Sequence, residues 1–366
     1  MKQTVRGRAR LDYVWWLSLL TLIGLFIVNV AGFVDTETGS ALGCGHQWPL
    51  CNGSVVPSSW DLQTIIEFAH RAIVGGISLL LIATAILAWR KYGHWLEVRL
   101  FILVAVGFVF VEAGLGAIGV LFSDPPAILA IHLGVSLLAF TGVALLTVVL
   151  TQIQRVAGKT AAEKTVEPHA KVAAAKPQGE LHGRHLRSTH MPRHFRFWTY
   201  FALGFTFVAL YVGAYIANIH AGSWFRGFPF PTESYRVAGV NLLFDILHRS
   251  IALGLVSLCI GLLISASRMR KQRKDLYRGA GLAVLFVCMQ GMSGGLLVFS
   301  HLAIWAFLLH VSIVSCLFAT LGYLSLQVSP EPRRRVALKG EERQGAAQAA
   351  VEEATHRPRH GQGVVQ

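Results

Sequence analysis

Long apolar segments alternate with short polar segments along the chain. Eight of the apolar segments reach the roughly 20 residues that an α-helix needs to cross the hydrocarbon core of a bilayer. They cover residues 13–34, 63–89, 98–122, 127–151, 197–219, 240–266, 278–299 and 302–327. The first segment is too long for a cleaved signal peptide and lacks a small-residue cleavage site. The pattern predicts an all-α membrane protein with eight transmembrane helices.

Composition and charge support this fold class. Hydrophobic residues make up 54% of the chain and charged residues only 14%, against about 25% charged residues in soluble domains. With the N-terminus in the cytoplasm, 29 of the 33 Lys and Arg fall in cytoplasmic segments, and only Arg226 and Arg236 fall in outer ones. This asymmetry predicts a multi-pass plasma-membrane protein with both termini cytoplasmic. The net charge of +14 therefore indicates topology and contact with anionic membrane lipid, and we exclude a nucleic-acid partner.

Four regions follow from the pattern. We expect an N-terminal four-helix half over 1–151, a basic cytoplasmic linker over 152–196, a C-terminal four-helix half over 197–329 and a disordered cytoplasmic tail over 330–366. The linker is rich in Ala, Lys and His and is predicted to be flexible. Its histidines could bind a metal, but a solvated basic loop fits the composition better. The tail is polar and poor in aromatic residues.

The two halves repeat the same polar positions inside their apolar segments. The pairs, each 178 residues apart, are Glu67 and Asp245, His70 and His248, Arg71 and Arg249, Glu112 and Gln290, Gly116 and Gly294, and His132 and His310. Agreement at this many positions indicates a duplicated unit. We therefore predict two tandem four-helix bundles related by a pseudo-two-fold axis along the membrane normal.

The repeated histidines are the strongest candidates for a functional site. A single intramembrane histidine is more often hydrogen-bonded to a neighbouring helix, but four at repeated positions favour function. His70 and His132 are expected at similar depths, as are His248 and His310. Two such imidazoles in a bundle can bind one haem iron from both faces, so we predict that all four are axial haem ligands. Zinc fits less well, because it favours clustered ligands at short spacing.

An arginine follows the first histidine of each pair. The guanidinium groups of Arg71 and Arg249 suit the propionates of a haem. The alternative is an ion pair with Glu67 or Asp245, and the sequence leaves both open. Glu112 lies inside an apolar segment, and its role cannot be assigned from the sequence.

A cysteine pair lies in the first loop on the outer side. Cys44 and Cys51 face an oxidising compartment, where a disulfide is expected. Whether the bond is structural or redox active stays open. The corresponding loop of the second half has His220 and Trp224 instead, so the duplication is asymmetric. The remaining cysteines, Cys259, Cys288 and Cys316, lie in apolar segments and are predicted to be buried packing residues.

These motifs resemble the haem A synthase family, especially its Gram-positive bacterial branch with an outer cysteine pair. The resemblance rests on the loop Thr-Gly-Ser…Gly-Cys-Gly-x-x-Trp-Pro-Leu-Cys-Asn-Gly and on the Glu-x-x-His-Arg helix. It covers Val14 to Leu326 without the linker. The family oxidises the C8 methyl of haem O to the formyl group of haem A, which serves terminal oxidases.

The resemblance implies roles for the site residues. His248 and His310 match the ligands of a haem b cofactor, and His70 and His132 match those of the substrate haem O. Glu67 matches an essential carboxylate and would handle protons. The implied partners are a haem O synthase, oxidase assembly proteins and an outer thiol–disulfide reductant. Two axial histidines leave no open iron position, so either one N-terminal ligand dissociates or the oxidation uses another route.

Two other functions account for part of the sequence pattern. A di-haem membrane cytochrome b for electron transfer explains the histidine pairs but neither Glu67 nor the cysteine loop. A transporter is disfavoured, because no predicted helix is broken by proline near its middle and because a transporter predicts no haem pigment.

Overall fold

The computed structural model describes residues 11–166 and 192–330. Its helices are α1 (Tyr13–Glu37), α2 (Leu62–Tyr92), α3 (Leu96–Leu121), α4 (Pro126–Val166), α5 (Arg193–Asn218), the 3₁₀ turn η2 (Ala221–Trp224), α6 (Tyr235–Ala238), α7 (Val240–Arg268), α8 (Lys274–Phe299) and α9 (Ile304–Val328). The predictions for the middle of the linker and for the tail lie outside the described residues.

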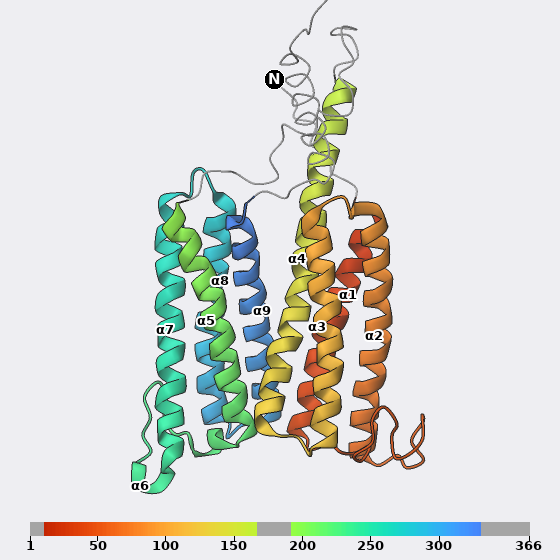
Figure 1. The fold of residues 1–366 in the computed structure, drawn as a ribbon. Coiled ribbons are helices and arrows are strands. Elements are labelled where there is room, and N and C mark those ends of the chain that lie inside the picture. The colour runs from red at the N-terminus through yellow and green to blue at the C-terminus, as the bar shows by residue number, and fades with distance from the viewer. Residues whose placement is uncertain (1–10, 167–191, 331–366) are drawn as a thin grey trace, which may run out of the picture.

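The predicted fold class is confirmed. Eight helices of the described chain are long and apolar enough to span a membrane, and the described residues form no β-structure beyond an isolated bridge between Cys51 and Ser54. Figure 1 shows α1–α4 gathered on one side and α5 and α7–α9 on the other. The pseudo-two-fold axis stays a prediction.

Two loops lie at the same end of the molecule. The cysteine loop (residues 38–61) joins α1 to α2, and the α5–α7 segment (residues 219–239) contains η2 and α6. Figure 1 shows both at the end opposite the projecting C-terminal part of α4. We call this the loop end.

Helix α4 is longer than the sequence pattern predicted. The apolar segment ends at residue 151, but the helix continues to Val166 and projects beyond the bundle (Figure 1). The prediction of a flexible linker that starts at residue 152 is therefore wrong for residues 152–166. The apolar criterion ended the prediction too early, because Ala-, Lys- and Glu-rich sequence forms helix without a hydrophobic run.

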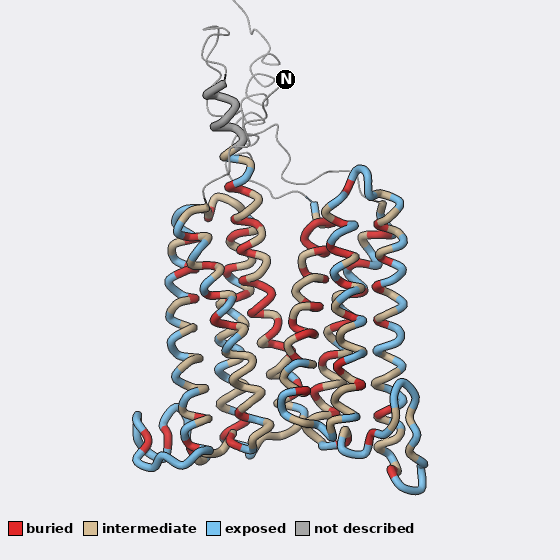
Figure 2. Tube along the Cα trace, turned by 180° about the vertical axis from the view of Figure 1, so that it is seen from behind, coloured by how far each residue is buried: buried red, intermediate tan, exposed pale blue. Residues whose placement is uncertain are grey.

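The two groups of helices share a packed core. Helix α4 is the most buried span, and Figure 2 shows buried positions concentrated where the two groups meet. A Cβ on Gly322 of α9 would lie 2.7 Å from Cγ2 of Thr141 of α4, so the two backbones approach closely there. Such small-residue contacts are typical of helix packing in membranes. Phe207 of α5 and Phe318 of α9, whose rings lie 6.2 Å apart, belong to the same hydrophobic cluster as Phe140 of α4.

At the opposite end from the loops, Asp12 connects three helices of the first half. It caps α1 by accepting from the backbone N–H of Trp15. It also accepts from the hydroxyl of Tyr92 at 2.7 Å, pairs with Lys91 at 2.7 Å, and accepts from the amide of Gln154 of α4 at 2.6 Å. Partial burial disfavours the charged form, but these hydrogen bonds together hold the pKa of Asp12 below its ordinary value.

Replacing Asp12 with Ala is predicted to lower the free energy of unfolding by about 1 kcal/mol for the cap alone, with a further loss from the stranded Lys91 and Tyr92. Because the pKa is depressed, the contribution is present above the pKa of an unfolded Asp and is lost as pH falls through the native value. Thermal unfolding in detergent micelles at several pH values measures this. Asp61→Ala, which removes the exposed cap of α2, is the matched control and should cost less; an equal loss would contradict the prediction.

Candidate functional site

The site of the first half begins with an acid–arginine pair on α2. Asp61 caps this helix by accepting from the N–H of Thr64. Glu67, His70 and Arg71 then follow at positions i, i+3 and i+4, which share one helix face. Glu67 is almost completely buried and pairs with Arg71.

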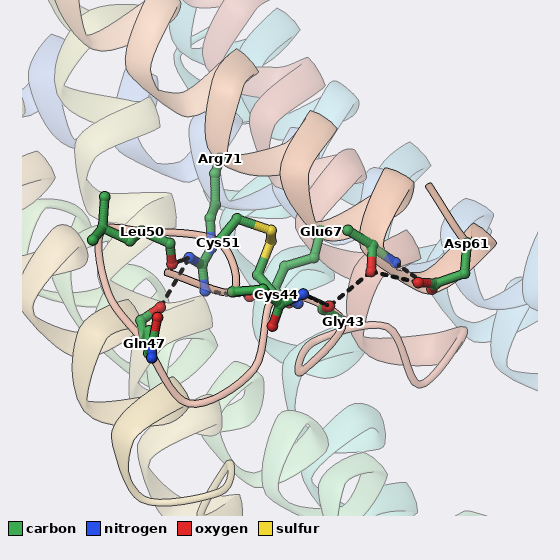
Figure 3. Close-up of a disulfide and its surroundings, with 10 residues drawn as sticks. Gly43, Cys44, Gln47, Leu50, Cys51, Asp61, Glu67 and Arg71 are labelled. Carbon is green, nitrogen blue, oxygen red and sulfur yellow. Dashed lines mark hydrogen bonds and ion pairs between the residues drawn. A yellow bond between two sulfur atoms is a disulfide. The ribbon is translucent and has the colours of Figure 1, made fainter. Parts of the chain in front are cut away.

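This pair also binds the cysteine loop, as Figure 3 shows. The backbone N–H of Cys44 donates to Glu67 Oε2 at 2.5 Å. Arg71 Nη1 donates to the carbonyl oxygens of Gln47 at 3.1 Å and Leu50 at 3.0 Å. The carboxylate therefore anchors one side of the loop and the guanidinium the other.

The predicted disulfide is confirmed. Cys44 and Cys51 are joined, and both are buried. The loop lies directly on α2: Thr64 Oγ1 donates to the Gly43 carbonyl at 2.8 Å. A Cβ on Gly43 would lie 2.5 Å from the backbone of Gln63, so only glycine permits this approach.

The second half repeats the arrangement without cysteines. Arg249 Nε donates to buried Asp245 at 2.6 Å. Its Nη1 atom donates to the carbonyl oxygens of Gly227 at 3.0 Å and Pro229 at 2.9 Å in the α5–α7 segment. Instead of a disulfide, Glu233 Oε2 accepts from backbone N–H groups of the same segment. Both arginines therefore pair with their own helix's acid, and contact with haem propionates stays a prediction.

The histidines are half-buried. His132 lies within electrostatic reach of His70, and His310 within reach of His248. Each ring rests against a glycine of a neighbouring helix. An added Cβ would lie 3.1 Å from Cε1 of His70 at Gly32 and 3.4 Å from Cε1 of His132 at Gly116. In the second half it would lie 3.2 Å from Cε1 of His248 at Gly213 and 3.5 Å from Cε1 of His310 at Gly294.

The ring nitrogens differ in their partners. Among the described residues, Nδ1 of His70, His132 and His248 is buried without a hydrogen-bond partner. His132 Nδ1 does lie 3.3 Å from the carboxyl of Glu112. Both nitrogens of His310 are engaged, by Gln290 and Ser293.

Sequence reasoning missed Gly32 and Gly213, which are 181 rather than 178 residues apart and so escaped the repeat. It also missed Asp35, a buried carboxyl at the end of α1 within electrostatic reach of Glu67 and Asp124. Burial raises the pKa of Asp124, which lies between α3 and α4. The loop end of the first half therefore contains more acidic side chains than the sequence motif predicted.

One minor prediction is wrong. Cys259 is buried, but Cys288 is exposed on the surface of α8 and Cys316 is only partly buried. An apolar sequence context does not distinguish the side of a span that faces lipid from the side that faces protein, because both are apolar.

Comparison with known proteins assigns the chain to a family. The family model of COX15-CtaA, described as cytochrome oxidase assembly protein, matches residues 14–322. The chain belongs to this family. The matched range contains all four histidines, both acid–arginine pairs and the disulfide.

Relatives of the family match nearly their whole length. A Heme A synthase of Bacillus licheniformis is 32% identical over 315 residues, covering 86% of this chain and 95% of the relative. A Heme A synthase of Bacillus mycoides is 31% identical over 313 residues, covering 85% of this chain and 92% of the relative.

Replacing Arg71 with Gln is predicted to speed reduction of the buried disulfide by a membrane-impermeant phosphine about tenfold or more. The loop would lose hydrogen bonds from a charged donor, each worth about 1.5–3 kcal/mol. The rate is followed by alkylation of the released thiols. Arg249→Gln is the matched control, since it loosens a loop without cysteines; equal rates in the two variants would contradict the role of Arg71.

Proposed function

We propose that this protein is a haem A synthase of the plasma membrane that oxidises the C8 methyl of haem O to the formyl group of haem A. The observation that supports this best is the pair of histidine sites, each lying on a glycine-lined helix face beside an acid–arginine pair that binds a loop. Membership of the family and the Heme A synthase relatives agree with it.

The residues present suit haem. Among the described residues, Nε2 of His70, His132 and His248 takes part in no hydrogen bond, so this nitrogen is available to bind iron, whereas Nε2 of His310 contacts Gln290. Glycine at each ring leaves room for the imidazole beside the neighbouring helix. His248 and His310 would hold a haem b cofactor, and His70 and His132 the substrate haem O, with Arg71 and Arg249 near the propionates.

Glu67 is the residue we assign to proton handling. It lies one turn from His70 on the same face of α2, it is buried, and one oxygen is held by Cys44 N–H and the other by Arg71. This fixes the carboxyl group beside the substrate site. The bound haem b supplies electron transfer; the chain orients the substrate and excludes water.

The cell context follows from the topology. We place both termini in the cytoplasm and the loop end on the outer face. The cysteine disulfide then faces an oxidising compartment, where a thiol–disulfide reductant could reach it only after the loop opens. A haem O synthase would supply the substrate within the membrane, and oxidase assembly proteins would receive the product.

Pigment analysis tests the function. A strain lacking the protein should accumulate haem O, and expression of the protein should restore haem A. Glu67→Gln should keep the haem b spectrum but lower haem A formation by at least 100-fold, the scale of a lost acid–base group. Unchanged haem A in the deleted strain rejects the synthase; haem b without any effect on haem A favours the electron-transfer cytochrome.

Replacing Gly213 with Ala tests the haem b site. The added Cβ would lie 3.2 Å from Cε1 of His248 and should displace the ring, lowering the haem b absorbance per protein several-fold. Gly204→Ala on the same helix is the matched control, because no described atom lies within 4 Å of its added Cβ. Equal haem content in both variants would show that His248 does not hold the cofactor.

A further inference from the structure

The two sites differ in the side chain that contacts the second histidine of each pair. Glu112 of α3 and Gln290 of α8 occupy repeated positions, and each faces the histidine of the following helix. Glu112 Oε1 lies 3.3 Å from His132 Nδ1, whereas Gln290 Nε2 lies 2.8 Å from His310 Nε2. The two aligned side chains therefore contact opposite nitrogens of the ring, and a metal at Nε2 of His310 would have to displace the Gln290 amide.

The hydrogen bonds of the second half assign the protons of His310. Ser293 Oγ donates its hydrogen to the backbone carbonyl oxygen of Gln290. Toward the His310 ring it can therefore only accept a hydrogen bond, from Nδ1–H at 2.9 Å. Nε2 then carries the lone pair, and the Gln290 amide donates to it. His310 is thus a neutral imidazole whose N–H is held by a neutral hydroxyl.

The first half has no such hydroxyl. The position aligned with Ser293 is Leu115, one helical turn after Glu112. Among the described residues, the Glu112 carboxyl is the polar side chain recorded near His132 Nδ1. The Glu112 carboxyl group therefore lies beside His132 Nδ1 without forming a hydrogen bond to it, and Nε2 is left for a ligand.

A carboxyl acceptor changes a metal-bound histidine. It fixes the tautomer and the ring orientation and makes the imidazole a stronger donor to the metal. A stronger donor favours the oxidised metal, so it lowers the reduction potential of a haem iron. A hydroxyl acceptor has the same orienting effect but a weaker electronic one.

We propose that Glu112 is a positioning residue that makes His132 the firmly held axial ligand of the first site and gives that site the lower reduction potential of the two. The proposal rests on the function proposed above. His70 has no comparable partner: its Nδ1 has none among the described residues, and its ring contacts Gly32. His70 would then be the less firmly held of the two histidines.

Redox titration of the purified protein, loaded with haem b and haem O, tests this. In Glu112→Gln the lower-potential component should move up toward the other one, and haem in the first site should dissociate about 10–100-fold more readily. The double variant Glu112→Gln with Leu115→Ser rebuilds the second-half arrangement. It should restore retention of haem in the first site but leave the reduction potential of that haem high. A merely structural role of Glu112 would not separate these two effects.

Ser293→Ala is the second-half control and should weaken retention of the second haem alone, because it removes the acceptor of His310 Nδ1–H. Unchanged potentials in Glu112→Gln, or equal shifts of both components, would overturn the role of Glu112 while leaving haem binding and haem A formation intact. Unmodified protein that binds no haem would instead reject the proposed function, and this role with it.

Discussion

The structure depends on how imidazole and carboxyl groups are satisfied inside a membrane. No water is available in the hydrocarbon region, so each buried polar atom needs a partner from the chain or from a ligand. Glu67 meets this requirement through Arg71 and the backbone N–H of Cys44. Asp245 pairs with Arg249 through Oδ1, but its Oδ2 has no hydrogen-bond partner among the described residues, and neither has Nδ1 of His70 or His248. The first acid is therefore fully paired within the protein, whereas the second acid and these two histidines are not.

The arginines connect this requirement to the loops. Each guanidinium has more donors than one carboxylate can accept, and the remaining donors of Arg71 and Arg249 reach loop carbonyls. A loop held in this way covers the end of its bundle and keeps water from the acid beneath. The disulfide in one loop and Glu233 in the other are two solutions to the same task, holding a short irregular segment in one shape.

The apolar segments and the outer cysteine pair were enough to predict the spans and the disulfide. These features depend on local pattern and on the number of crossings. The glycines beneath His70 and His248 were not predictable, because the relative rotation of packed helices follows from side-chain interdigitation. Nor were the loop contacts of Arg71, since the sequence does not specify the backbone path between two helices.

The two halves carry the same polar residues at repeated positions, and the positions at which they differ distinguish the two histidine pairs. Two identical haem sites would have similar potentials, with little driving force for electron transfer from one to the other. The residues around His132 and His310 differ at two aligned positions, where Glu112 and Leu115 stand in place of Gln290 and Ser293. Of these side chains, Glu112 and Ser293 lie beside Nδ1 of their histidine, whereas Gln290 lies beside Nε2. A small change one turn long can therefore give two copies of one scaffold different electronic properties, while their helices, loops and acid–arginine pairs stay the same.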